Sequence, residues 1–182
     1  MRFLLKLLFL LLSIIAIVLI VGLFVDGDFS VSRKVTINQP KEVTFEYLSM
    51  IGNQQDYGVW QKKDANIVIK TTGTDGMVGF ISSWDSSMEE VGAGEQEITE
   101  ITDNKLIATE IRFKRPREIT SQAYLEINEE SSNSCTVEWR LEGGSPYPWN
   151  IFALFIDMEK EIGPDLKKGL QNLKSILESQ NN

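Results

Sequence analysis

The chain begins with a continuous stretch of apolar residues. Residues 3–25 contain a single charged side chain, Lys6, and residues 7–25 form an uncharged run of 19 residues. A helix rises about 1.5 Å per residue, so this run would span roughly 28 Å, close to the hydrocarbon thickness of a bilayer. A buried core helix would show one polar face, and this run shows none. The pattern therefore predicts one membrane-spanning helix.

The same stretch resembles a secretory signal peptide in its position, but its length and its end favour an anchor that is not cleaved. Signal peptides have a shorter apolar core of about 7–15 residues, followed by a cleavage site of small residues. Residues 21–25 read VGLFV and contain no such site. We therefore expect residues 1–27 to be a transmembrane signal anchor and residues 28–182 to be one soluble domain.

Charges on either side of the apolar run predict its orientation. Arg2 and Lys6 precede most of it, whereas Asp26 and Asp28 follow it directly. Basic residues favour the cytoplasmic side of a membrane. We expect a single-pass protein whose N-terminus is cytoplasmic and whose soluble domain is extracytoplasmic.

Downstream of the anchor, apolar and polar positions alternate with the period of two that is typical of half-buried strands. The alternation is visible at residues 29–38 and clearest at residues 119–128 and 135–142. Turn sequences at residues 74–76 and 103–105 separate further strands. Strands with one apolar and one polar face are typical of an antiparallel sheet.

Two segments show helical spacing instead. Pro40 is well placed to open a short helix, because a first helical residue needs no N–H donor. Near the C-terminus, apolar residues recur every three or four positions from Ile162 to Leu177, and Gly163-Pro164 marks either the start of this helix or a kink in it. Gly169 lies on or near the apolar stripe, where it would admit either a ligand or a close strand.

The order of elements is a strand, a helix pair, about six antiparallel strands and a long C-terminal helix. This order predicts an α+β fold in which a curved antiparallel sheet is wrapped on the C-terminal helix. Because a curved sheet and a cylindrical helix do not match everywhere, such an arrangement tends to leave a cavity between them.

Composition excludes several kinds of chemistry. The 182 residues include no histidine and one cysteine, Cys135, so a catalytic triad, an imidazole or cysteine metal site and an internal disulfide are all excluded. The net charge of −8 argues against a nucleic-acid partner. The acidic pairs 89–90 and 129–130 adjoin turns and are best interpreted as solvated surface. We expect no metal, no cofactor and no catalytic residue.

Three segments of the soluble part carry a family resemblance. Residues 35–45 read VTINQPKEVTF, a first strand running into a helix after proline. Residues 56–66 read DYGVWQKKDAN, and residues 148–174 read PWNIFALFIDMEKEIGPDLKKGLQNLK. Together with the order of elements, they resemble the helix-grip fold of the START-related SRPBCC superfamily, whose members include birch-pollen-allergen-like proteins. The N-terminal anchor is similar to that of the membrane-anchored branch described as polyketide cyclase/dehydrase and lipid transport.

The resemblance implies a hydrophobic cavity between the sheet and the C-terminal helix. It covers roughly residues 28–180 and does not select one activity, because a fold hosts many functions. We expect a membrane-tethered domain that binds a hydrophobic, lipid-like small molecule, with the membrane contacted through residues 3–25. The candidate cavity-lining residues are Trp84, Phe113, Trp139, Phe155, Met158, Leu166 and Leu170.

Two alternatives stay open at this point. The first is a cyclase-like enzyme that uses a carboxylate, tyrosine or arginine in the same cavity, although the sequence shows no convergent set of such groups. The second is a ligand-free interaction module of the cell envelope, which a cavity smaller than a few hundred cubic ångströms would favour. The aromatic segment around Tyr147, Trp149, Phe152 and Phe155 either enters the membrane interface or closes the base of the C-terminal helix.

Overall fold

The computed structural model describes residues 2–179, which fall into two compact units. The first unit runs to Phe29 and also takes in Gly144–Asp157. The second comprises Ser30–Gly143 and the chain from Met158 onward. The chain therefore returns to the N-terminal unit after the last strand, an arrangement that the pattern of hydrophobic positions did not indicate.

The N-terminal unit combines an apolar helix with a short helical segment. Helix α1 (Arg2–Gly22) has 21 residues and is long and apolar enough to cross a membrane or to be a signal sequence. The 3₁₀ helix η3 (Trp149–Leu154) packs near its C-terminal end. Asn150 joins the two, because its Nδ2 donates to the carbonyl oxygens of Gly22 at 2.7 Å and Val25 at 2.8 Å.

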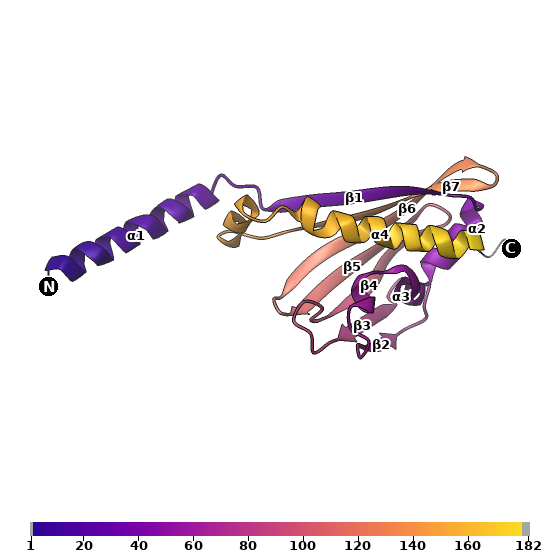
Figure 1. The fold of residues 1–182 in the computed structure, drawn as a ribbon, viewed down its shortest axis with the longest axis horizontal. Coiled ribbons are helices and arrows are strands. Elements are labelled where there is room, and N and C mark those ends of the chain that lie inside the picture. Colours follow the sequence, from indigo (N-terminus) through magenta and orange to yellow (C-terminus); the bar gives the residue numbers. More distant parts are fainter. Residues whose placement is uncertain (1, 180–182) are drawn as a thin grey trace. The chain divides into compact units, whose positions relative to one another are not determined.

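The second unit is built on one sheet of seven strands in the order β1-β7-β6-β5-β4-β3-β2 (Figure 1). Neighbouring strands from β2 to β7 pair antiparallel, as the alternating patterns predicted. The strands are β1 (Asp28–Ile37), β2 (Val68–Thr72), β3 (Ile81–Asp85), β4 (Ala93–Thr102), β5 (Leu106–Arg115), β6 (Ile119–Ser131) and β7 (Ser134–Gly144).

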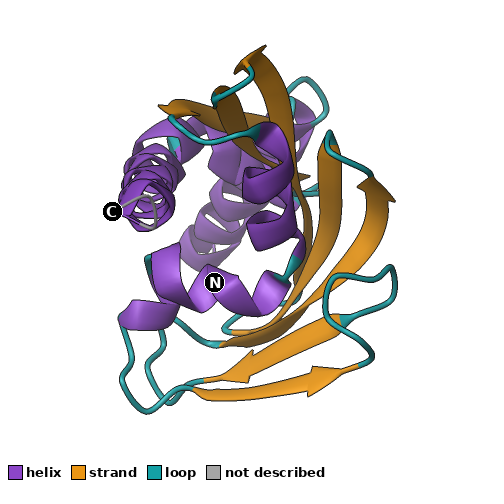
Figure 2. Ribbon diagram, turned by 90° about the vertical axis from the view of Figure 1, so that its right-hand side faces the viewer, coloured by secondary structure: helices purple, strands orange, loops and turns teal. Residues whose placement is uncertain are grey.

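Helices cover one face of this sheet, and the strands curve around them (Figure 2). Their side of the sheet carries the buried residues, among them Ile98, Ile107, Leu125 and Val137. The helical elements of this unit are α2 (Lys41–Ser49), η1 (Ile51–Asn53), α3 (Gln54–Tyr57), η2 (Trp60–Lys62) and α4 (Met158–Ser179).

Helix α4 lies along β1 and is tied at one end to this strand and at the other to the segment that follows it. Near its start, Arg33 Nη2 lies 2.6 Å from Glu159 Oε1, and near its end Gln39 Nε2 donates to the carbonyl oxygen of Leu177 at 2.6 Å. The helix begins at Met158, so the Gly163-Pro164 pair lies inside it rather than at its start. Its buried stripe consists of Gly163, Leu166, Gly169, Leu170, Leu173 and Leu177.

The face of the sheet opposite the helices is polar, and Arg112 is the centre of an ionic network on it. Its guanidinium lies 2.8 Å from Glu95, 2.7 Å from Glu97 and 2.6 Å from Glu110. Hydrogen bonds from Lys114 and Arg112 lower the pKa of Glu95, and those from Arg112 and Gln122 lower the pKa of Glu110.

This network predicts a pH dependence of stability. A carboxyl whose pKa is lower in the folded state stabilises the protein above its unfolded pKa of 4.5 and loses that contribution as the pH falls through the folded value. We expect Arg112→Gln to weaken the loss of stability below pH 4.5, because the carboxyls then titrate closer to their unfolded pKa. Denaturant unfolding of the full chain in lipid nanodiscs at a series of pH values measures the free energy of unfolding and its dependence on pH.

The matched control is Lys105→Gln, which removes one positive charge from the exposed turn between β4 and β5. An acid dependence that is equally steep in wild type and Arg112→Gln would show that the network does not set it.

Candidate functional site

A cavity of about 180 Å³ lies inside the second unit, between the sheet and the segments that cover it. Its lining is mostly apolar and comes from strands β3, β4, β5 and β7, from the helical elements α3, η2 and α4, and from the loops that carry Ile67 and Glu90. We refer to it as the tryptophan cavity, because three of the four tryptophans of the chain line it. The lining residues are Gln54, Trp60, Gln61, Ile67, Trp84, Glu90, Val91, Gln96, Ile111, Phe113, Trp139, Leu141 and Leu166.

Edge-to-face aromatic contacts hold the cavity walls in place. On one side, the Trp60 ring meets the Trp139 ring at 6.1 Å between centroids, and Trp139 in turn meets Tyr57 at 5.7 Å. On the other side, Trp84 from β3 meets Phe113 from β5 at 5.6 Å. The Trp84 indole also donates its N–H to the carbonyl oxygen of Val91 at 3.2 Å. The walls are thus fixed by ring packing on both sides.

Three glutamine side chains give the tryptophan cavity its polar groups. Gln96 faces inward from β4, and its Nε2 donates to Thr109 Oγ1 at 3.0 Å, so its Oε1 is left for other partners. Gln61 Oε1 is buried and has no hydrogen-bond partner within residues 2–179. Both residues, together with Gln54 and Trp84, also line a side pocket of about 30 Å³. A space of this size holds one water molecule or one hydroxyl group.

The loop that carries Trp60 and Gln61 is held in place by hydrogen bonds at each end. On one side, Asn172 of α4 donates to the carbonyl oxygen of Tyr57 at 3.0 Å. On the other, the buried Asp64 accepts hydrogen bonds from Ser86 Oγ and from the backbone N–H of Asn66. These bonds lower the pKa of Asp64, with Ser86 the main cause.

The Asp64–Ser86 contact joins the two loops that contribute to the lining. Residues 60–67 supply Trp60, Gln61 and Ile67, and the loop that follows Ser86 supplies Glu90 and Val91. Of the thirteen lining residues, Glu90 is the one with an ionisable side chain, and it is exposed. The wall of the cavity therefore carries amides and aromatic rings but no buried charge.

Four of the seven residues that the sequence suggested lie in this lining, namely Trp84, Phe113, Trp139 and Leu166. Leu170 is buried one turn further along α4, outside the lining. Met158 is the first residue of α4 and is half-buried, also outside the lining. Phe155 belongs to the N-terminal unit, where its side chain is 79% exposed.

The sequence analysis did not select the polar part of the lining. Alternation along β4 places Gln96 on the inner face, because its neighbours Glu95 and Glu97 face outward. The same pattern could therefore have predicted that Gln96 lines the cavity. Trp60 was noted only as part of a resemblance. Gln54, Gln61 and Ile67 lie in short irregular elements with no period to read, and only the fold brings them to the cavity.

Comparisons with known proteins concern the fold alone. No protein-family model matches the sequence, and no curated protein matches it. Among solved structures, norcoclaurine synthase from Thalictrum flavum in complex with a transition-state analogue superposes with a TM-score of 0.64 at 12% identity, covering 86% of this chain and 98% of that one. The chain has the helix-grip fold.

A second helix-grip structure, the Aha1 dimer from Colwellia psychrerythraea, matches with a TM-score of 0.55 at 13% identity, covering 80% of this chain and 93% of that one. A structure of norcoclaurine synthase from Thalictrum flavum in complex with dopamine and hydroxybenzaldehyde has a TM-score of 0.62 at 11% identity. The match covers 88% of this chain and 92% of that one. These likenesses show the fold alone, and it is the fold that the order of elements predicted.

Gly169 sets how closely α4 of the helix-grip domain approaches the cavity wall. A Cβ atom at this position would lie 2.7 Å from Cζ3 of Trp139. The sequence left open whether Gly169 makes room for a ligand or for a close strand. The contact with Trp139 of β7 shows that it makes room for a strand residue. The Trp139 indole makes edge-to-face contacts with Tyr57 and Trp60, so a shift of the ring away from residue 169 would disturb these contacts.

We expect Gly169→Ala to destabilise the domain, although alanine is the better helix former. The helix gains up to about 1 kcal/mol in propensity, whereas overpacking a core costs about 1–3 kcal/mol, so the net loss is about 1 kcal/mol. Denaturant unfolding, monitored by tryptophan emission, measures this loss of stability. Lys168→Ala, at the exposed neighbouring position of α4, serves as the control. A Gly169→Ala variant more stable than wild type would contradict the close approach.

Proposed function

We propose that this protein is a membrane-tethered helix-grip domain that binds a small, uncharged hydrophobic molecule in the tryptophan cavity. The observation that carries the proposal is an apolar cavity of about 180 Å³ lined by four aromatic rings and three glutamine side chains. Well-packed interiors leave few voids larger than a water molecule, so an unfilled space of this size favours a ligand.

The volume limits the size of the molecule. Pockets for drug-sized ligands measure about 300–1,000 Å³, whereas an apolar cavity of about 150 Å³ is enough to bind benzene. At about 180 Å³, the tryptophan cavity suits a molecule of one or two rings rather than a whole membrane lipid. The ligand we propose is therefore smaller than the lipid-like molecule that the resemblance implied.

The polar groups of the lining limit its chemistry. Gln96 offers an amide oxygen, which accepts a hydrogen bond from a ligand hydroxyl or amine. The side chains of Gln54 and Gln61 add two further amides to the lining. Neither the cavity nor its side pocket has a lysine or arginine in its lining. Transfer of an ionised carboxylate into such a site is costly because no cation would pair with it. We therefore propose a neutral hydroxyl-bearing ring compound, with the hydroxyl directed at the side pocket.

The tether supports the same proposal. Helix α1 has 21 residues, which at about 1.5 Å per residue match the hydrocarbon thickness of a bilayer. Hydrophobic small molecules partition into membranes, so a domain anchored there samples them at a raised effective concentration. The charges that flank α1 favour a cytoplasmic N-terminus and an extracytoplasmic domain.

Catalysis is the weaker alternative for this cavity. A cyclase-like enzyme would need an acid or base that touches the ligand. None of the thirteen lining residues is a tyrosine or an arginine, and the one carboxylate among them, Glu90, is exposed. Tyr57 lies against Trp139 and does not line the cavity. Burial raises the pKa of Tyr57, which keeps its phenol protonated. The modest volume favours a ligand-free module, but such a module would leave a space of about 180 Å³ unfilled.

Binding of 2-naphthol tests the proposal in the full chain reconstituted in lipid nanodiscs. We expect saturable quenching of tryptophan emission, because Trp60, Trp84 and Trp139 surround the ligand. The carboxylate 2-naphthoate, which has the same rings, should bind at least about tenfold more weakly, a difference of about 1.4 kcal/mol. Fluorescence titration measures both affinities.

Two variants that fill the cavity distinguish binding from partition into the lipid. Ile111→Phe and Val91→Phe each add a ring to the lining and should abolish the saturable signal. Thr120→Phe adds the same ring at an exposed position of β6 and should leave it unchanged. The proposal fails if the folded filled variants respond to 2-naphthol as wild type does.

A further inference from the structure

The N-terminal unit exposes an unusual number of large apolar side chains outside its membrane-length helix. They belong to residues 145–156, which we name the aromatic segment. Trp149 is 61% exposed and Phe155 is 79% exposed. Monomeric soluble proteins rarely expose contiguous apolar surface of this kind without an interaction partner. The other exposed apolar residues of the segment are Tyr147, Phe152, Leu154 and Ile156.

Charge is absent where these side chains gather. Residues 144–156 contain no aspartate, glutamate, lysine or arginine, although such residues make up 24% of the whole chain. The Trp149 and Phe152 rings stack with an interplanar angle of 5° and a centroid distance of 6.2 Å. Aromatic residues of this type are enriched at the membrane–water interface.

Direct contacts fix the aromatic segment at the C-terminal end of α1. Asn150 donates both of its Nδ2 hydrogen bonds to carbonyl oxygens of Gly22 and Val25. The backbone N–H of Ser145 donates to the carbonyl oxygen of Gly27 at 3.2 Å. Gly27 permits this approach, since a Cβ atom there would lie 2.3 Å from the Ser145 carbonyl oxygen. The segment therefore lies at the depth where α1 ends.

We propose that the aromatic segment enters the headgroup region of the bilayer and is a second membrane contact beside α1. The inference rests on the proposed membrane tether, because the end of a spanning helix lies at the interface by necessity. The continuity of the apolar surface from Leu23 and Phe24, which are 67% and 84% exposed, into the aromatic segment favours lipid as the occupant.

A fluorophore attached at Phe155→Cys tests the inference in the full chain, in nanodiscs that hold one copy each. The native Cys135 is buried and does not compete for the label. We expect a blue-shifted nitrobenzoxadiazole emission, quenched at least twofold more strongly by lipids with a nitroxide near the headgroup than by lipids with a nitroxide deep in the acyl chain.

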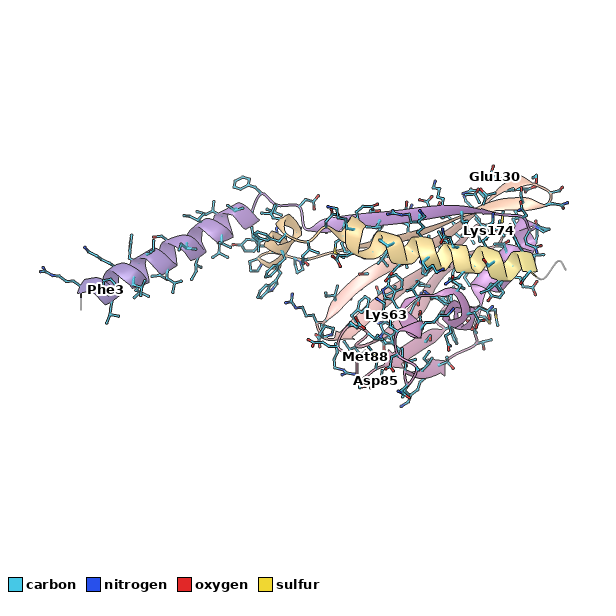
Figure 3. All side chains as sticks on the ribbon, viewed as in Figure 1. Phe3, Lys63, Asp85, Met88, Glu130 and Lys174 are labelled. Atoms are coloured by element: carbon cyan, nitrogen blue, oxygen red, sulfur yellow. The ribbon has the colours of Figure 1, made fainter. Side chains whose placement is uncertain are left out.

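Two further label positions give the reference environments. Leu10→Cys lies near the middle of α1 and should be quenched most strongly by the deep nitroxide. Glu130→Cys lies near the β6–β7 turn (Figure 3), at the opposite end of these strands from Gly144, and should stay in water. Asn150→Asp removes the two donors and should move the Phe155→Cys label toward water.

Each contrary outcome has a separate meaning. A label at Phe155→Cys that is as exposed to water as that at Glu130→Cys, with Leu10→Cys still quenched, overturns the inference and leaves the tether intact. A Leu10→Cys label that no nitroxide lipid quenches overturns both. Protection of Phe155→Cys that appears only in nanodiscs with two copies identifies a second copy as the occupant and also overturns it.

Discussion

Seven strands spaced about 4.8 Å apart make a sheet about 29 Å wide, whereas a helix with its side chains covers only about 10 Å. Helix α4 lies along β1, at one edge of the sheet. The remaining width is covered by α2 and by short irregular elements between Ile51 and Ile67, and the irregular elements cannot fill the concave face as closely as a helix can. The tryptophan cavity is a consequence of this mismatch.

Charge is sorted between the two faces of the sheet. Outward positions of β4 and β5 carry Glu95, Glu97, Glu110 and Arg112, which pair with one another. Inward positions of the same strands carry amides, hydroxyls and rings, because an unpaired buried charge is too costly. The tryptophan cavity is consequently neutral, and its selectivity must come from shape and hydrogen bonding.

The sequence predicted the elements of the fold well and the site only in part. Alternation at residues 119–128 and 135–142 was sufficient for β6 and β7, and the leucine spacing was sufficient for α4, because burial of one face imposes those periods. The same logic reached Trp84, Phe113 and Trp139. It could not reach Trp60 or Gln61, whose positions depend on hydrogen bonds between distant segments.

Two other features depended on tertiary contacts that no local pattern records. The sequence left Gly169 open between a ligand and a neighbouring strand, and the Trp139 ring decides for the strand. The second feature is the association of residues 144–157 with α1 in one compact unit, which no local pattern in the sequence indicated. Asn150 carries that association, and an asparagine in an apolar segment gives no hint of a partner more than a hundred residues away.

The contact between Asp64 and Ser86 has a kinetic consequence. It joins the two loops that flank the tryptophan cavity, and it is buried from solvent. For a molecule that leaves between these loops, the residence time would follow the lifetime of this hydrogen bond and the packing around it. Affinity, in contrast, would follow the fit to the aromatic walls. Substitutions at the loop contact and in the walls should therefore change dissociation rate and equilibrium binding independently of each other.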